Sequence, residues 1–313
     1  GRSPALQRLR EQVKRVAQHD TWVLISGEPG SGRETLARYL HSQSIRRDRP
    51  FVDVGVSSMT KGNAARELFG QEEEGRIHYG RLEQAAGGTL FLDEVADMDL
   101  EAQAQLVGAL DTGSFMRMGG VEPVSIDVRI IAATQHNLEE AVQSGNFRED
   151  LFYHLNVVPL HVPALREHAE DVPELLSFYV DWYVRHEKLP YRRFTVGAQN
   201  TLRNHPWYGN VRELKNLVQR LLILGVGDEI SQEEVEAALG APELSMGTGG
   251  LDGMISFDQP LRQAREQFEK VYLEYQLRQH EGNISRMAKD VGMERTHLYR
   301  KLRTLEIEFK DRR

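Results

Sequence analysis

Residues 27–34 read Gly27-Glu28-Pro29-Gly30-Ser31-Gly32-Arg33-Glu34, a glycine-rich turn between an apolar stretch and a helical pattern. Trp22-Val23-Leu24-Ile25 precedes the turn as a predicted strand, and helical spacing of apolar residues resumes from Glu34 to His41. Glycines let backbone N–H groups approach an anion, and a helix N-terminus adds positive potential. The order of strand, turn and helix therefore predicts a loop that binds nucleotide phosphates. The alternative is a connecting turn without a ligand.

The loop departs from the usual phosphate-binding pattern at its cation. Arg33 stands where the pattern expects lysine, and Glu34 stands where it expects serine or threonine, with Thr35 next to it. Because arginine is longer and planar, it cannot place a point charge between the terminal phosphates as lysine does. We therefore expect binding of ATP or ADP with weak or absent hydrolysis. The candidate nucleotide-binding residues are Gly27, Glu28, Gly30, Ser31, Gly32, Arg33, Glu34 and Thr35.

A second apolar strand ends in two carboxylates, in the sequence Thr89-Leu90-Phe91-Leu92-Asp93-Glu94. Following a phosphate loop, such a strand predicts that Asp93 holds Mg²⁺ and that Glu94 polarises the attacking water. On its own the motif is equally typical of a solvated strand end.

Further apolar runs at residues 51–56 and 128–133 alternate with helical stretches, which is typical of an α/β fold with a parallel sheet covered by helices. We predict an α/β nucleotide-binding subdomain over residues 1–170 and a purely helical lid over 171–240. Residues 241–258 begin with a Gly-, Pro- and Ser-rich stretch and are predicted to be a linker. Within the lid, Tyr191-Arg192-Arg193 is interpreted as a solvated turn.

Composition excludes several classes of protein. The 313 residues contain no cysteine, so disulfides, thiolate metal sites and cysteine nucleophiles are excluded, and reducing cytoplasm is the expected setting. No apolar run approaches the roughly 18 residues of a membrane span, and no membrane partner is expected. The formal net charge is −8, so any nucleic-acid surface must be local. Because the chain opens with Gly1 in a helical pattern, we expect an excised fragment.

The predicted C-terminal domain, residues 259–313, is all-α and locally basic. From Asn283 to Arg313 nine Lys or Arg stand against five acids, a local charge of +4. Two short helical patterns around Gly292 have the spacing of a helix-turn-helix, whose second helix enters the major groove of DNA. We assign Arg295, Thr296 and His297 to base edges and Arg300 and Lys301 to phosphates, with Leu298 and Leu302 in the core. The alternative is a basic helical hairpin without a DNA ligand.

Residues 1 to about 240 resemble the AAA+ domain of bacterial enhancer-binding proteins, the sigma-54-dependent activators. The C-terminal helices resemble the Fis-type DNA-binding domain that ends these regulators. The matching stretches are Glu67-Leu68-Phe69-Gly70, Gly87-Gly88-Thr89-Leu90-Phe91-Leu92-Asp93-Glu94, Gly119-Gly120, Val128-Arg129-Ile130-Ile131-Ala132-Ala133-Thr134, Phe147-Arg148-Glu149-Asp150-Leu151-Phe152-Tyr153, Leu165-Arg166-Glu167 and Gly209-Asn210-Val211-Arg212-Glu213-Leu214.

The resemblance implies homo-oligomers, with AAA+ rings that bind ATP between subunits and a dimer through the C-terminal domain. It also implies that Arg148 is an arginine finger for a neighbour's nucleotide and that Arg212 is the sensor arginine of the lid. Three departures weaken the implied hydrolysis: Arg33 in the loop, His154 where a second finger is usual, and Gly55 where an asparagine is common.

Family activators also carry a GAFTGA loop that contacts sigma-54, whereas here residues 71–80 fill the gap without that motif. Loss of the loop is a feature of the NtrX-like branch of response regulators, which this sequence resembles more than it resembles a standard activator. The resemblance then implies a receiver domain N-terminal to this chain and a cognate sensor kinase.

Three functions remain open from the sequence. The favoured one is a DNA-binding regulator with a hydrolysis-impaired AAA+ domain that acts without remodelling sigma-54, as a repressor or on another polymerase form. The second is an active ATPase that remodels the sigma-54 RNA polymerase holoenzyme, which keeps RNA polymerase as a candidate partner. The third is a nucleotide-switched assembly scaffold with incidental DNA affinity.

Overall fold

The computed structural model describes residues 1–59 and 63–240, and in the C-terminal part residues 269, 272, 273, 276, 277, 284, 287, 288, 293 and 295–304. Of these, the side chains of residues 295–297, 303 and 304 are left undescribed. The chain divides into two compact units, residues 1–240 and 241–313. The predicted linker, residues 241–258, lies outside the described residues.

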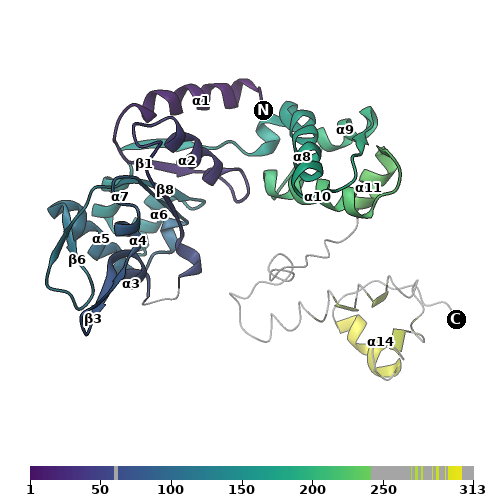
Figure 1. Cartoon of the computed structure of the whole chain (residues 1–313). Helices are drawn as coiled ribbons and strands as arrows, with labels where there is room; N and C mark the ends of the chain where they lie inside the picture. Colours follow the sequence, from purple (N-terminus) through teal and green to yellow (C-terminus); the bar gives the residue numbers. More distant parts are fainter. Residues whose placement is uncertain are drawn as a thin grey trace. The chain divides into compact units, whose positions relative to one another are not determined.

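A five-stranded parallel sheet in the order β2-β5-β8-β1-β9 forms the centre of the α/β part of the first unit, residues 1–161. Figure 1 labels its strands β1 and β8. The strands are β1 Val23–Ser26, β2 Phe51–Gly55, β5 Thr89–Asp93, β8 Arg129–Thr134 and β9 Val158–His161. The sequence predicts four of these strands, whereas β9 is absent from its predictions. The α/β class with a parallel sheet is confirmed.

Strand register brings the functional segments to one edge of the sheet. Ser26, the last residue of β1, lies opposite Thr134 of β8, and Gly55 of β2 lies opposite Asp93 of β5. In parallel sheets, ligands bind outside the carboxyl ends of the strands. The phosphate loop follows β1 and the two acids end β5, so both lie at the same edge of the sheet, on either side of β8.

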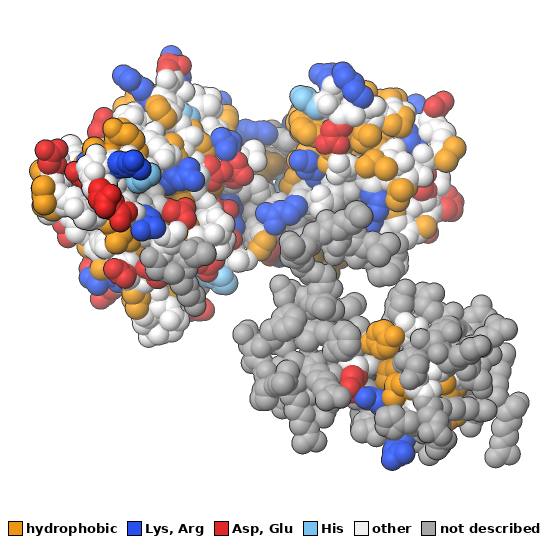
Figure 2. Space-filling model, turned by 60° about the horizontal axis from the view of Figure 1, so that its bottom comes forward, with side chains coloured by type: hydrophobic (Ala, Val, Ile, Leu, Met, Phe, Trp, Pro, Cys, Tyr) orange, Lys and Arg blue, Asp and Glu red, His pale blue; other side chains and the backbone are white. Residues whose placement is uncertain are grey.

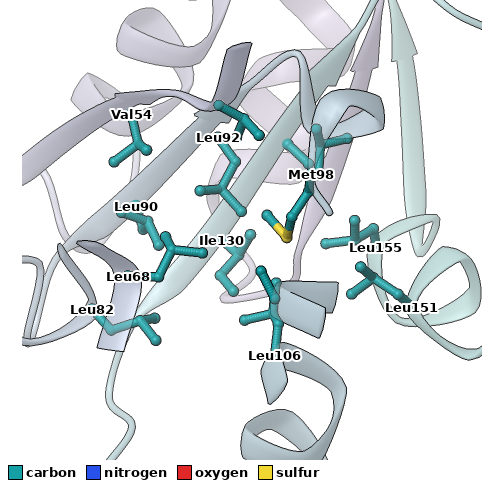
Figure 3. Packing of buried hydrophobic residues seen from close by; sticks show 14 of the residues in the cluster. Val54, Leu68, Leu82, Leu90, Leu92, Met98, Leu106, Ile130, Leu151 and Leu155 are labelled. Carbon is teal, nitrogen blue, oxygen red and sulfur yellow. The ribbon is translucent and has the colours of Figure 1, made fainter. Parts of the chain in front are cut away.

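Helices cover both faces of the sheet because the side chains of buried strands alternate between faces. Phe91, Ile131 and Ile25 pack against two helices, α1 Pro4–Ala17 and α2 Arg33–Ser42. Leu90 and Leu92 point to the opposite face and pack with Leu68, Leu106 and Leu151 (Figure 3). The helices on that face are α3 Ala64–Phe69, α4 Arg81–Gln84, α5 Leu100–Thr112, α6 Leu138–Gln143 and α7 Glu149–Leu155, with the 3₁₀ turns η1 Val56–Ser58 and η2 Val95–Asp97 nearby.

The N-terminal helix shows how local sequence sets the element bounds. The Ser3 side chain caps α1 by accepting a hydrogen bond from the Leu6 N–H, and Pro4 occupies the first helical position. Leu9, Val13 and Ala17 recur at four-residue steps and are buried against the sheet. The cap and the apolar spacing together account for the bounds of α1.

Two hairpins extend from this subdomain: β3 Gly70–Glu73 with β4 Arg76–Tyr79, and β6 Ser114–Met116 with β7 Pro123–Ser125. Glu74 and Gly75 both have positive φ, as a two-residue turn of the I′ type requires. The hairpins are joined because the Glu72 N–H donates to Met118 O at 2.9 Å and the Met118 N–H donates to Gly70 O at 3.0 Å. Arg117 connects the second hairpin to α4 through two hydrogen bonds to Glu83 of 2.8 and 2.9 Å.

The lid follows the 3₁₀ turn η3 Leu165–Asp171 and packs around its own core, which includes the fully buried Trp207. Its helices are α8 Val172–His186, α9 Val196–Arg203, α10 Asn210–Leu224 and α11 Gln232–Gly240. The prediction of helices alone is wrong in one detail, because β10 Arg193–Phe194 and β11 Glu229–Ile230 form a short parallel pair.

Arg192 holds this lid together from the inside. Its guanidinium is 1% exposed, binds both carboxylate oxygens of Glu234 at 2.6 and 2.8 Å, and donates to backbone carbonyls that include Leu221 O and Gly227 O. A buried cation persists only when paired and hydrogen-bonded in this way. The interpretation of Tyr191-Arg192-Arg193 as a solvated turn is therefore wrong for Arg192.

In the second unit, α14 Arg295–Thr304 is the described helix that carries the predicted DNA contacts. Leu298 and Leu302 are fully buried and pack with Leu273, Ile284 and Met287, which confirms that both leucines belong to the core.

Candidate nucleotide site

The glycine-rich loop runs from the end of β1 into the first turn of α2. Gly30 and Gly32 have φ of +77° and +106°, a region that L residues other than glycine enter at a steric cost. Gly32 begins the helix without a side-chain cap, and the first helical hydrogen bond runs from the Leu36 N–H to Gly32 O. The N–H groups of the first turn are therefore available to an anion.

Ser31 provides an independent sign of a ligand. Its hydroxyl is buried inside the loop, 8% of the residue is exposed, and Ser31 Oγ has no hydrogen-bond partner among the described residues. Buried polar groups are almost always paired, so an orphaned hydroxyl indicates a partner that binds from outside. A phosphate oxygen in the loop would accept this hydrogen bond, and the loop residues therefore fit a nucleotide phosphate.

Arg33 does not extend toward the open side of the loop. Arg33 is only 7% exposed. Its Nη1 donates to Gly27 O at 3.1 Å, and its Nη2 lies 3.3 Å from Asp93 Oδ1. The same Nη2 forms a short ion pair with Glu94 Oε1. The cation of the loop is thereby bound to the two acids that end β5.

Glu94 is fixed on both sides. While Oε1 binds Arg33, Oε2 accepts a hydrogen bond from the Gln135 N–H at 3.3 Å, just beyond β8. Its backbone adopts the left-handed conformation at φ 54°, which turns the chain away from the strand. A carboxylate that polarises water needs a free oxygen facing the phosphate. In this arrangement both Glu94 oxygens are engaged within the protein.

Asp93 is the residue expected to hold magnesium. Burial raises its pKa, while the neighbouring Arg33 acts to lower it. Asp93 Oδ1 already accepts from the Glu94 N–H at 3.1 Å and lies against Arg33. Glu34, which replaces the hydroxyl ligand after the loop cation, instead binds Arg38 at 2.7 Å. The residues present at this position do not fit a nucleotide-bound Mg²⁺.

The lid and the turn η3 before it both contact the phosphate loop directly. Arg166 of η3 forms a two-pronged ion pair with Glu28, one bond of which measures 2.8 Å. These hydrogen bonds, with a further one from Asn210, lower the pKa of Glu28 to about 2. A Cβ at Gly30 would clash with Gly209 O, so the start of α10 lies directly over the loop.

Arg212 lies over the loop in the same way. Its Cβ is 2.9 Å from the position of a Cβ on Gly30, its N–H donates to Gly30 O at 3.3 Å, and the residue is exposed. No ion pair or hydrogen bond joins its guanidinium to any residue of the described ranges 1–59 and 63–240. Its side chain is therefore free to reach a nucleotide.

Arg148 and His154 share α7, far along the chain from the loop. Arg148 is the N-cap residue, is 42% exposed and binds Asp150 at 2.7 and 3.0 Å. His154 binds Asp111 of α5 at 2.9 Å. Arg148 thus remains at the surface, where a neighbouring subunit could meet it, whereas His154 is engaged inside its own chain.

Sequence reasoning missed three residues that complete the site, namely Gln135, Arg166 and Asn210. A cavity of about 560 Å³ opens beside the start of the loop, between the carboxyl ends of β1, β8 and β9. Its lining includes Ser26, Glu28 and Gln135. The signals were present in the stretches Leu165-Arg166-Glu167 and Gly209-Asn210, but nothing in the spacing reveals that both meet Glu28.

The predicted DNA-binding residues lie on α14. Arg295, Thr296 and His297 begin the helix, but their side chains lie outside the described residues. Arg300 is exposed, and Lys301 binds Glu269 at 2.8 Å.

On the face of the first unit shown in Figure 2, acidic and basic side chains are interspersed. None of the helices in the described residues is long and apolar enough to cross a membrane.

Three family models match the chain in sequence order. The sigma-54 interaction domain matches residues 1–161, the AAA+ ATPase lid domain 166–248, and the bacterial regulatory protein, Fis family, 264–305. Together they define an AAA+ nucleotide-binding regulator with a Fis-type helix-turn-helix.

Individual relatives narrow the family. The nitrogen assimilation regulatory protein NtrX of Azorhizobium caulinodans is 46% identical over 98% of this chain and 68% of its own length. The DNA-binding transcriptional regulator NtrC of Rhizobium meliloti is 43% identical over 76% of this chain and 50% of its own. The crystal structure of NtrX from Brucella abortus in complex with ATP has a TM-score of 0.73 and 40% identity, covering 98% of this chain and 69% of that one. The chain belongs to the NtrX/NtrC family of enhancer-binding transcriptional regulators, as its motifs predict.

Proposed function

We propose that this chain binds ATP and ADP in the loop of residues 27–35, hydrolyses ATP slowly or not at all, and regulates transcription through its C-terminal DNA-binding domain. The observation that carries the proposal is the position of Arg33, whose guanidinium is bound to Asp93 and Glu94 instead of facing the phosphates. The orphaned Ser31 hydroxyl and the uncapped start of α2 support nucleotide binding. The NtrX protein of Brucella abortus has been crystallised with ATP and with ADP, which supports the same ligands here.

Slow hydrolysis follows from what surrounds the terminal phosphate position. Glu94 is held by Arg33 and by the Gln135 N–H, so each of its oxygens is already bound within the protein and the carboxylate is not free to turn toward an attacking water. Gly55, opposite Asp93 in the register, supplies no side chain there. Catalysis of phosphoryl transfer consists mainly of positioning and charge stabilisation, so loss of these parts removes most of the rate. Magnesium at Asp93 is the part of the predicted site that this arrangement does not support.

We assign Arg212 to the nucleotide and Arg148 to a neighbour's nucleotide in an assembled ring. The exposure of both side chains and the place of Arg212 over Gly30 support these roles. A dimer through the C-terminal domain, a receiver domain N-terminal to this chain, and control by a sensor kinase are part of the same proposal, by analogy with NtrX and NtrC.

DNA binding rests on the Fis-family match and on the local positive charge. We propose that Arg295, Thr296 and His297 contact base edges and that Arg300 and Lys301 contact phosphates. Binding in vitro to promoter fragments, compared between the full chain and a chain ending at residue 240, tests this part. Equal binding by both chains would contradict it.

Regulation is proposed to proceed without remodelling of the sigma-54 holoenzyme. The β3–β4 hairpin occupies residues 70–79 and closes in a tight turn at Glu74 and Gly75, without the GAFTGA sequence. ATP-dependent formation of open promoter complexes by sigma-54 polymerase would favour the active ATPase instead. The retained pair Asp93 and Glu94 and the exposed Arg148 are the observations in favour of that second function.

A further inference from the structure

The unusual feature of the site is that Asp93 and Glu94 already form ion pairs with Arg33. Arg33 is 7% exposed and bridges Gly27 O, Asp93 and Glu94. Resting on the proposed nucleotide site, we infer that this chain binds its nucleotide as the metal-free polyphosphate anion. The single positive charge of the Arg33 guanidinium offsets part of the negative charge of Asp93 and Glu94, a task that Mg²⁺ shares in other phosphate-binding loops.

Asp93, Glu94 and a bound triphosphate are all negatively charged. Two carboxylates beside a triphosphate repel it, and at short range in a partly buried site that repulsion is strong. A cation must therefore stand between them, and in lysine-containing loops Mg²⁺ and lysine share that task. Here the guanidinium stands against Asp93 and Glu94 before any ligand arrives.

The residues that would hold a metal already have partners within the protein. Asp93 Oδ1 is shared between Arg33 and the Glu94 N–H, so a metal would have to displace a buried guanidinium to use it. The neutral hydroxyl that usually follows the loop cation is replaced by Glu34, which binds Arg38. Mg²⁺ in nucleotide sites is held by one or two protein oxygens together with water and phosphate. Here the carboxylate oxygen nearest the loop cation is already paired, and position 34 offers no hydroxyl.

The phosphates do not need the Arg33 side chain. The uncapped N–H groups at the start of α2 and the orphaned Ser31 hydroxyl provide donors at the loop. Arg212, an exposed cation whose Cβ lies over Gly30, is close enough to add positive charge. Phosphate binding through these groups is independent of a metal. The account therefore predicts that chelating Mg²⁺ leaves nucleotide affinity nearly unchanged.

The experiment measures ATP binding to the full chain by calorimetry in excess Mg²⁺ and in excess EDTA. We expect the two Kd values to agree within about threefold. A Kd in EDTA that is weaker by about tenfold or more would overturn the inference while leaving the nucleotide site in place. Absence of ATP binding in both buffers would instead refute the proposed nucleotide site itself.

Removing the Arg33 charge tests its role directly. Arg33→Met uncovers both acids, so its ATP affinity in EDTA should fall by about tenfold or more and Mg²⁺ should restore most of it. Arg47→Met removes an exposed arginine just after α2 and should change neither value. Equal weakening of Arg33→Met in both buffers would show that Arg33 acts on the phosphates and would overturn the inference. If Arg33→Met does not fold, as circular dichroism would show, the wild-type comparison decides alone.

Discussion

The side-chain amide of Asn210, at the start of α10, donates a hydrogen bond to Glu28 of the phosphate loop at 3.0 Å across 182 residues of sequence. The same amide donates to Pro29 O at 3.1 Å, and its oxygen accepts from the Leu165 N–H at 2.8 Å. One fully buried side chain therefore joins the lid, the turn before it and the loop. Asn210 thereby holds the start of the lid against the phosphate loop.

Replacing this residue tests the connection. Asn210→Ala removes three hydrogen bonds, leaves the Leu165 N–H buried and unpaired, and places alanine at φ +55°, so we expect a loss of about 2–4 kcal/mol in the free energy of unfolding. Asn200→Ala, on the exposed face of α9, should stay within about 0.5 kcal/mol of wild type. Urea unfolding measures both variants. If the two variants were equally stable, the hydrogen bonds of Asn210 would not contribute to the free energy of unfolding.

The Glu28 carboxylate predicts a pH dependence. The hydrogen bonds from Arg166 and Asn210 lower its pKa from 4.5 to about 2 in the folded state. A lowered folded-state pKa stabilises the protein above pH 4.5, and that stabilisation is lost as the pH falls toward 2 because the unfolded state takes up the proton first. Since 40% of the side chain is exposed, screening limits the effect to about 1 kcal/mol or less.

The measurement compares wild type with Glu28→Gln by chemical unfolding at pH 6 and at pH 3. The advantage of wild type should be larger at pH 6 and should shrink at pH 3. Glu139→Gln, an exposed substitution at the start of α6, corrects for the general effect of removing a negative charge. A wild-type advantage that grows as the pH falls would have the wrong sign for this account.

Restoring the loop lysine should not restore hydrolysis. In Arg33→Lys the shorter side chain can release Glu94. Two other parts expected for hydrolysis stay absent. Gly55 supplies no side-chain amide beside Asp93. His154, at the position of the second arginine finger, still binds Asp111. We therefore expect phosphate release to rise by less than about tenfold while ATP binding persists. A turnover on the order of 1 per second, ordinary for a working enzyme, would show that the finger position matters less than the loop.

The two basic residues of α14 should differ in their effect on DNA. The Lys301 side chain is 26% exposed, whereas Arg300 is exposed and so presents more of its surface to a DNA phosphate. Arg300→Ala should weaken DNA binding at low salt and should reduce by about 1 the magnitude of the slope of log K for DNA binding against log salt concentration. Lys301→Ala should change this slope less. Fluorescence anisotropy over a salt series separates the two. A larger change in slope for Lys301→Ala would contradict the assignment.

The predictable part of the site is the part that is local in sequence. Gly30 and Gly32 reveal the loop because only a tight turn with left-handed backbone needs glycine at both places, and Asp93-Glu94 follows an apolar strand. Parallel strands alternating with helices then fix the class of fold. The bounds of α1 follow from its cap and its apolar spacing.

The unpredictable part consists of contacts between distant segments. Spacing cannot tell whether Arg33 faces the phosphates or, 61 residues away, Glu94. It likewise cannot show that Arg166 reaches back to Glu28. Arg192 was misjudged because a basic residue between a tyrosine and another arginine resembles a solvated turn, while the carbonyls and Glu234 that bury it come from later elements. Side-chain direction in three dimensions decided each of these cases.

The most direct test of a nucleotide-binding domain without turnover is a paired measurement on the purified chain. ATP binding is measured by calorimetry, and phosphate release is measured over a series of protein concentrations. The account predicts binding with negligible release at every concentration, because Arg33 and the Gln135 N–H keep Glu94 from the water. Release whose specific rate climbs with protein concentration would mean that subunits complete each other's sites, and it would contradict the account.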